Sequence, residues 1–164
     1  MKIEKLLSLL KDNKVEFVLI GAVAFPVYGY SRSTLDTDIF IRPTIENARN
    51  TLIGLEEFGY DVSSLTPESL LKKKTLIRQY IVETDIHPFV KGISFEEAWE
   101  NKVEDFFGKQ KVYFASLPDI IKMKKAAGRV KDREDLSDIT EKIHKILGKA
   151  VLEEHKIEVD DMVS

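Results

Sequence analysis

Two aspartates in one short segment carry the strongest chemical signal in the sequence. Asp36 and Asp38 lie two residues apart in DTDIFIR, residues 36–42, where most of the other residues favour β-strands. Successive side chains of a strand point to opposite faces, so this spacing places both carboxylates on one face with Cβ atoms roughly 7 Å apart. Carboxylates at that separation can hold hard cations such as Mg²⁺ through oxygen ligands.

A third carboxylate follows in a later segment of the same character. In IVETDIH, residues 81–87, alternation places Glu83, Asp85 and His87 on one face. If this strand lies beside residues 36–42, three acidic groups converge, with Asp85 as the third ligand and Glu83 in reserve. Close carboxylates repel each other without a cation, so the pattern predicts a Mg²⁺ site for phosphate chemistry. His87 either orients Asp85, assists proton transfer or is structural.

A simpler interpretation is that Asp36 and Asp38 mark the solvent face of a half-exposed strand. Two observations weigh against it. Aspartate is disfavoured in strands yet occurs twice on one face here, and the preceding loop offers Arg32 and Ser33, which are donors that a phosphate needs. Gly21, at the end of the apolar run VEFVLI, either allows close approach of a phosphate to the backbone or forms an ordinary tight turn.

A basic stretch near the C-terminus provides a second signal. Lys and Arg dominate residues 122–133, where Asp132 is the single acid, and most of these charges are expected on a solvated helix surface. Lys124 differs, because it falls within the apolar stripe of its helix, which begins at Leu117. A lysine on that side either snorkels outward or serves as a ligand for a phosphate or carboxylate at the acidic site.

The elements that position these groups alternate between helix and strand. Periodicity and capping residues predict helices at residues 3–12, 44–59, 95–101, 116–128 and 132–148, and strands at residues 15–20, 36–42 and 112–114. Residues 75–90 are expected to supply one or two further strands, and residues 22–30 a short helical or irregular piece. This order predicts an α/β (α+β) chain that forms one unit over residues 1–164, with a sheet core at about 15–115 and C-terminal helices at about 116–156.

Composition excludes several classes of protein. The chain has 164 residues, 43% of them hydrophobic, and a formal charge of −3, so it can build a core and is neither disordered nor fibrous. It has no cysteine, so any metal must be bound by oxygen or by histidine. No apolar run approaches the roughly 20 residues of a membrane span, and the N-terminus is typical of a charged amphipathic helix rather than a secretory signal. We therefore expect a soluble, cytoplasmic protein.

Four segments in a fixed order resemble a known family. They are FVLIGAVA at residues 17–24, SRSTLDTDIFI at 31–41, ETDIHPF at 83–89 and LPDIIKMKKAAGRVKDREDLSDI at 117–139. Together they resemble the minimal nucleotidyltransferases of the DNA polymerase beta superfamily, in particular the AbiEii-type toxins. The resemblance covers residues from about 15 to 140, with a poorly matched middle. It departs from the family pattern at Ala22, where a second glycine or serine is usual.

The resemblance implies a small mixed β-sheet flanked by helices, with a two-metal site on it. Asp36 and Asp38 would hold Mg²⁺, and Asp85 would complete the site and accept the proton of the attacking hydroxyl. Enzymes of this kind move a nucleoside monophosphate from a nucleoside triphosphate to a hydroxyl and release pyrophosphate.

By resemblance, the surrounding residues would bind the triphosphate of ATP or another NTP. Gly21 and Ala22 would approach the phosphates, while Arg32 and Lys124 would offset their charge. The acceptor is left open among a tRNA end, a protein hydroxyl and a small molecule, and an antitoxin protein is an implied partner. Two other functions fit the same residues: a catalytically inactive nucleotide- or partner-binding module, which Ala22 favours, and a phosphoesterase.

Overall fold

The computed structural model describes residues 2–21, 36–80 and 83–141. Its helices are α1 (Lys2–Asp12), α2 (Ile45–Phe58), α3 (Pro67–Lys72), α4 (Phe95–Asn101) and α5 (Leu117–Ala127), and residues 130–141 are also helical. Its strands are β1 (Phe17–Ile20), β2 (Asp36–Ile41), β3 (Thr75–Ile77), β4 (Glu83–His87), β5 (Val103–Phe107) and β6 (Gln110–Phe114). None of the described helices combines the length and the apolar character needed to cross a bilayer.

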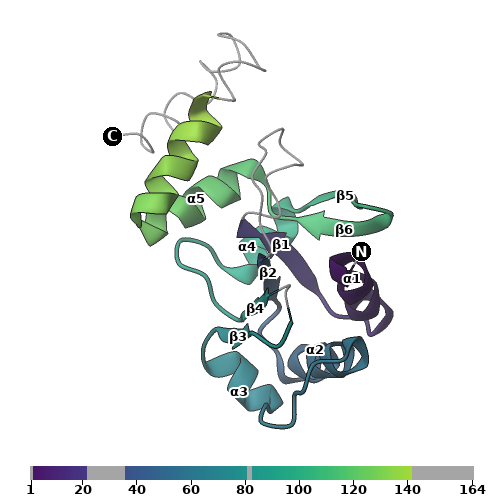
Figure 1. Cartoon of the computed structure of the whole chain (residues 1–164). Coiled ribbons are helices and arrows are strands. Elements are labelled where there is room, and N and C mark those ends of the chain that lie inside the picture. Colours follow the sequence, from purple (N-terminus) through teal and green to yellow (C-terminus); the bar gives the residue numbers. More distant parts are fainter. Residues whose placement is uncertain (1, 22–35, 81–82, 142–164) are drawn as a thin grey trace.

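The strands form one mixed sheet in the order β3-β4-β2-β1-β6-β5 (Figure 1). β1 runs antiparallel to β2, whereas β2 pairs with β4, and β1 with β6, in parallel. The α/β class predicted from the sequence and the mixed sheet implied by the resemblance are both confirmed. The parallel β2–β4 pair is the part that matters for chemistry, because its register sets Asp38 directly beside Asp85.

Helices cover both faces of the central strands. The rings of Phe40 on β2 and Phe95 on α4 meet edge to face with centroids 5.2 Å apart, so α4 covers the face that carries Asp38. On the opposite face Tyr60, which follows α2, shares a 2.8 Å hydrogen bond with Thr84. α1 packs beside α2 (Figure 1), and the core lies between the sheet and these helices.

Local capping signals fixed several predicted helix ends. The Thr44 side chain accepts a hydrogen bond from the backbone of Asn47 at the start of α2, and Gly59 ends that helix in the left-handed conformation. α4 spans the predicted residues, and α5 begins after the N-cap residue Ser116 and ends at Gly128 as expected. These boundaries are set by residues within one helical turn, which explains why the sequence alone was sufficient.

Other elements differ from expectation. The sequence did not predict α3 or β5, and the segment 75–90 divides into the two strands β3 and β4. The helix expected at 132–148 begins two residues earlier and is described as far as residue 141. The piece expected at 22–30 and the C-terminal tail lie outside the described residues.

Candidate active site

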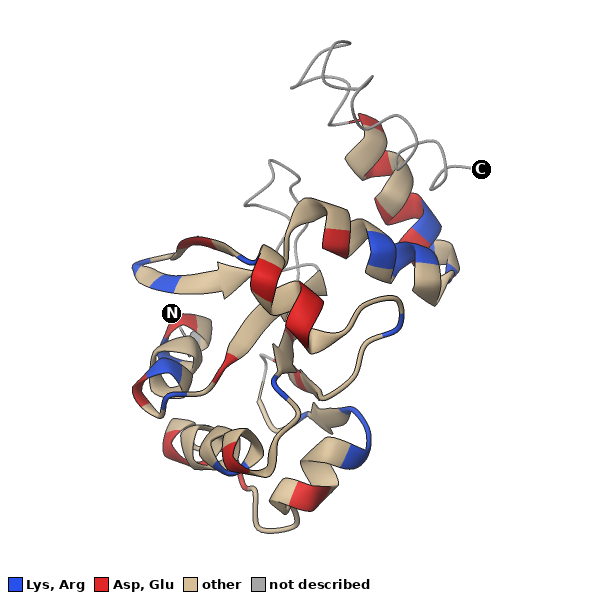
Figure 2. Ribbon diagram, turned by 180° about the vertical axis from the view of Figure 1, so that it is seen from behind, with Lys and Arg blue, Asp and Glu red and all other residues tan. Residues whose placement is uncertain are grey.

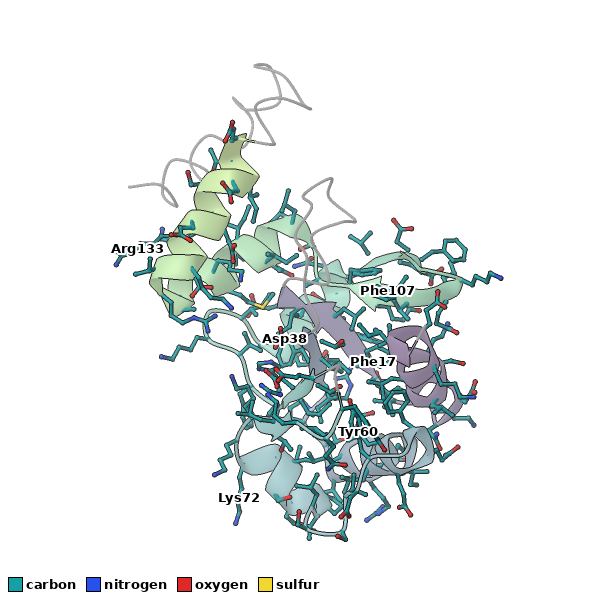
Figure 3. All side chains as sticks on the ribbon, viewed as in Figure 1. Phe17, Asp38, Tyr60, Lys72, Phe107 and Arg133 are labelled. Carbon is teal, nitrogen blue, oxygen red and sulfur yellow. The ribbon has the colours of Figure 1, made fainter. Side chains whose placement is uncertain are left out.

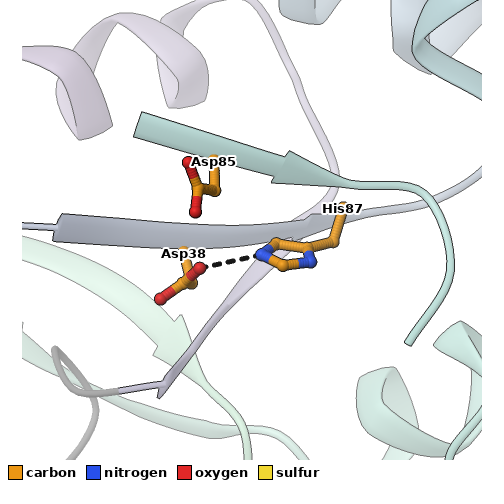
Figure 4. A group of neighbouring side chains, drawn as sticks. All are labelled: Asp38, Asp85 and His87. Atoms are coloured by element: carbon orange, nitrogen blue, oxygen red, sulfur yellow. Dashed lines mark hydrogen bonds and ion pairs between the residues drawn. The ribbon is translucent and has the colours of Figure 1, made fainter. Parts of the chain in front are cut away.

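Three side chains from β2 and β4 form the centre of the site. Because Asp38 pairs with Asp85 in the parallel register, their side chains share a face, and His87 follows Asp85 on the same face. One donor atom from each residue lies within 4.8 Å of the other two, and Nε2 of His87 is 2.8 Å from Oδ1 of Asp38 (Figure 4). Two carboxylates and an imidazole are donors that suit a divalent cation. The three residues are called the acidic centre below.

Asp36 and Glu83 lie two residues before Asp38 and Asp85 on the same two strands. Asp36 is the first residue of β2 and pairs with Glu83 in the β2–β4 register. Strand alternation puts Asp36 on the same face as Asp38, as predicted, but its side chain lies outside the part of the chain that the structure describes. The role of Asp36 as a metal ligand therefore remains a prediction.

Gly21 lies against the acidic centre. It follows β1 directly and has a φ of +72°, a conformation that favours glycine. A Cβ atom at this position would lie 2.6 Å from Oδ2 of Asp38, which is too close for two non-bonded atoms. The glycine thus allows the backbone to approach the carboxylate, and the structure brings this sequence-predicted residue to the site.

Arg78 is a neighbour of the site that the sequence did not reveal. It follows β3, and its guanidinium Nη1 lies 2.6 Å from Oδ1 of Asp85 while Nε lies 3.1 Å from Oε2 of Glu83. The guanidinium of Arg78 thereby orients Asp85 and offsets part of the negative charge of the site. Its position follows from the antiparallel pairing of β3 with β4, a register that the sequence left open.

A cleft of about 200 Å³ separates the acidic centre from the C-terminal helices. Asp38, labelled in Figure 3, lies near the middle of the molecule at this cleft. Its opposite wall carries cations on α5 and on the start of the helix at 130–141, where Lys and Arg gather in Figure 2. The cationic lining residues are Lys74, Lys124, Arg129 and Lys131. An acidic centre that faces a basic wall can bind a cation and a polyanion together.

Lys124 lies inward, on the apolar side of its helix. The residue is 8% exposed, and its Nζ lies 3.3 Å from Oδ1 of Asp132 and 3.0 Å from Oδ2 of Asp135. Of the two alternatives left open by the sequence, outward snorkelling is thus wrong. The partners are carboxylates of the next helix, and a contact with phosphate remains a prediction.

Asp132 is the centre of the charged network on this wall. Its side chain is fully buried and accepts hydrogen bonds from Nε of Arg129 at 2.6 Å and from Nη2 at 3.1 Å. It also accepts the backbone N–H of Arg129 at 3.2 Å, which caps the helix that begins at residue 130. Burial by itself raises the pKa of Asp132, but Arg129 and Lys124 outweigh that effect and hold the pKa below its usual value.

Arg129 connects this network to the acidic centre. Its hydrogen bond to Asp132 raises the pKa of the guanidinium above the ordinary value against the effect of burial, and the charge of Asp38 adds to the rise. Arg129 and Asp38 line the same cleft. The other basic residues of this stretch, Lys122, Lys125, Lys131 and Arg133, are exposed, as expected of a solvated surface.

Three of the residues predicted to bind phosphate lie before β2. Ala22, Arg32 and Ser33 lie in the segment 22–35, outside the described residues. Of the predicted site residues, the structure brings together Asp38, Asp85 and Gly21, and places Lys124 on the opposite wall of the same cleft.

A mixed sheet with paired aspartates on parallel strands, facing a basic helical wall, is an arrangement suited to phosphoryl or nucleotidyl transfer. The chain belongs to a family described as nucleotidyltransferases of unknown function (DUF6036), whose model matches residues 1–161. No match to the chain was found among curated proteins. The family description agrees with the nucleotidyltransferase class that the sequence motifs resemble.

Proposed function

We propose that the protein is a metal-dependent nucleotidyltransferase that moves a nucleoside monophosphate from an NTP to a hydroxyl and releases pyrophosphate. The observation that carries the proposal is the placement of Asp38 beside Asp85, at a cleft whose other wall is basic. Membership of a nucleotidyltransferase family supports the reaction class. The resemblance to the polymerase beta superfamily and to AbiEii-type toxins supports the finer assignment.

The donor set at the acidic centre fits a divalent cation. Carboxylate oxygens of Asp38 and Asp85 and the imidazole of His87 converge within 4.8 Å, and Gly21 lets the backbone after β1 lie directly against the Asp38 carboxylate. Asp36 would add a further carboxylate from the start of β2. A cation bound there, Mg²⁺ by resemblance, supplies charge neutralisation for the triphosphate and lowers the pKa of the attacking hydroxyl.

Residues on the two sides of the cleft would have different roles, proton transfer on one side and phosphate binding on the other. Asp85 would accept the proton of the attacking hydroxyl on a carboxylate oxygen. Arg78, which follows β3, orients that carboxylate through their ion pair. Arg129 and Lys131, on the opposite wall, would offset the charge of the phosphates. Lys124 would act mainly by holding Asp132 and so fixing the position of Arg129, besides any contact with phosphate.

The test combines binding and turnover on the full chain. Thermal unfolding with each of the four NTPs, with and without Mg²⁺, is expected to show a shift that depends on the metal and that Asp38→Asn abolishes. A ligand at 100 times its Kd adds about 2.7 kcal/mol of stability, which is readily measured. Asp105→Asn, at an exposed position of β5, is the matched control for loss of one negative charge.

Turnover is measured as pyrophosphate release and as transfer of α-phosphate label. We expect the wild type and the Asp105→Asn variant to release pyrophosphate. Asp38→Asn should lose at least about 10²–10³-fold in rate, the range seen when one stabilising group is removed from a reacting centre. Equal release by Asp38→Asn would contradict the proposal. A metal-dependent shift without turnover would instead support a nucleotide-binding module.

The acceptor and the biological role rest on the resemblance. Labelled NTP is offered with a tRNA pool, with cellular protein and with small hydroxyl compounds, and the fraction that takes up label identifies the acceptor class. A toxin role, with an antitoxin as partner, predicts growth arrest when the chain is expressed. Asp38→Asn should relieve that arrest, and growth unaffected by the wild type would speak against a toxin.

A further inference from the structure

We infer that His87 is itself a ligand of the divalent cation, which makes the acidic centre a mixed oxygen and nitrogen site that favours a first-row transition metal over Mg²⁺. The inference rests on the proposed function and adds to it a ligand and the identity of the preferred ion. It depends on one feature of the structure, which is the position of Nε2 of His87.

The position of this nitrogen matches that of a metal ligand. Two donor atoms bound to one ion at about 2.1 Å and at right angles lie roughly 3 Å apart. Nε2 of His87 and Oδ1 of Asp38 are 2.8 Å apart, and a donor oxygen of Asp85 lies within 4.8 Å of both. Figure 4 shows the imidazole turned toward Asp38 rather than away from the centre.

The strand register explains why the imidazole lies there. His87 follows Asp85 by two residues on β4, so both side chains lie on the same face. Its register partner on β2 is Phe40, one step beyond Asp38, and the His87 side chain is only 16% exposed. The ring therefore reaches the carboxylate of Asp38 from the next position on the same face instead of extending into solvent.

An imidazole ligand changes which ion is preferred. Mg²⁺ favours oxygen ligands and retained water, whereas imidazole nitrogen favours transition metals. The alternative is that His87 remains outside the ion and only holds Asp38 by a hydrogen bond. Loss of such an outer partner weakens metal binding about 10–100-fold, and it weakens all ions alike. Loss of a nitrogen ligand weakens a transition metal more than Mg²⁺, so the ratio of the two affinities separates the alternatives.

The experiment titrates the full chain with Mn²⁺ and with Mg²⁺ by calorimetry. His87→Gln is the informative variant because its amide can still donate a hydrogen bond to Asp38, and Asp105→Asn on β5 is the control. We expect most of the preference for Mn²⁺ over Mg²⁺ to be lost in His87→Gln and the preference to be unchanged in the control. An unchanged ratio in His87→Gln overturns the inference.

Pulsed electron paramagnetic resonance of the Mn²⁺ complex supplies a direct readout. Wild-type protein should show coupling of the ion to a histidine nitrogen, identified by labelling histidine with ¹⁵N, and His87→Gln should not. No such coupling in the wild type overturns the inference while leaving the proposed function intact if Asp38-dependent turnover is seen. Coupling in a protein that turns over no NTP supports the His87 ligand and removes the proposed function.

Discussion

The two walls of the cleft are built in opposite ways. The sheet wall consists of Asp38, Asp85 and His87, and the residues that meet there are up to 49 positions apart in the chain. The helix wall consists of residues 124–135, where each buried acid has a cation from the same stretch beside it. On the sheet wall, Asp38 and Asp85 come from two strands and contact His87 and Arg78. On the helix wall, the buried acids Asp132 and Asp135 contact cations from the same short stretch of chain. The charges of Asp132 and Asp135 therefore stabilise the fold, whereas Asp38 and Asp85 are the proposed ligands of a cation.

The largest effect expected from this comparison is on stability. Lys124→Met removes the ammonium that Asp132 and Asp135 share in a buried position. Removal of one partner from a buried ion pair is costly even though Arg129 still contacts Asp132. We therefore expect a loss of about 3 kcal/mol in the free energy of unfolding, measured by denaturant titration.

The matched variant on the sheet wall is Asp85→Asn. Asp85 is buried, but the side chain of its partner Arg78 is 40% exposed, and the amide oxygen of asparagine can still accept a hydrogen bond from it. Because repulsion with Asp38 is also relieved, the free energy of unfolding should change by less than about 1 kcal/mol. The two walls would be alike, and the comparison wrong, if Lys124→Met were as stable as the wild type or Asp85→Asn were the less stable of the two.

A second prediction compares two glycines with the same backbone conformation. Gly21, which lies against Asp38 of the sheet wall, and Gly128 at the end of α5 have φ values of +72° and +63°. Alanine at either position should cost about 1–2 kcal/mol, measured as above, because L-residues avoid this region. A Cβ at position 21 would lie 2.6 Å from Asp38, whereas at position 128 the nearest atom is 3.8 Å away.

Divalent-ion affinity should therefore separate the two variants. Gly21→Ala displaces the Asp38 carboxylate and should weaken binding of Mn²⁺ in calorimetry, while Gly128→Ala should bind Mn²⁺ as the wild type does. Equal affinities in the two variants would show that the carboxylate adjusts to the added methyl group and that Gly21 is needed only for its turn.

On the helix wall, the sequence predicted which side of the helix Lys124 occupies but left open whether its side chain turns outward. The side that Lys124 occupies follows from its spacing within one helix, and the ends of α2 follow from Thr44 and Gly59. The identity of the partners of Lys124 could not be predicted, because Asp132 and Asp135 reach it only through the turn at Gly128. Local rules determine which face a residue occupies, and tertiary geometry determines which residue it meets.

On the sheet wall, alternation predicted which residues share a face but not which neighbours they contact. The contact between His87 and Asp38 requires β2 and β4 to be adjacent, parallel and in one particular register, and no local signal specifies all three.

β5 was missed because it is an edge strand whose central residues are exposed, so it lacks the apolar alternation that predicts a strand. α3 is one short helix whose capping pair, Thr66 and Ser69, is less diagnostic than a Thr–Glu pair.

The smallest expected effect is a change with pH in the stability that Asp132 contributes on the helix wall. Arg129 and Lys124 hold the pKa of Asp132 below its ordinary value of 3.8 despite burial. A carboxyl group with a lowered pKa in the folded state stabilises the protein above its unfolded pKa, and this contribution is lost as the pH falls through the folded value. The difference in unfolding free energy between the wild type and Asp132→Asn should therefore be largest near neutral pH and should shrink below about pH 4. Denaturant titrations at several pH values measure it, with Asp105→Asn as the control for loss of an exposed charge. A difference that stays constant down to acid pH would mean that Asp132 acts through its shape and hydrogen bonds rather than through its charge, and the contrast between the two walls would then be one of packing.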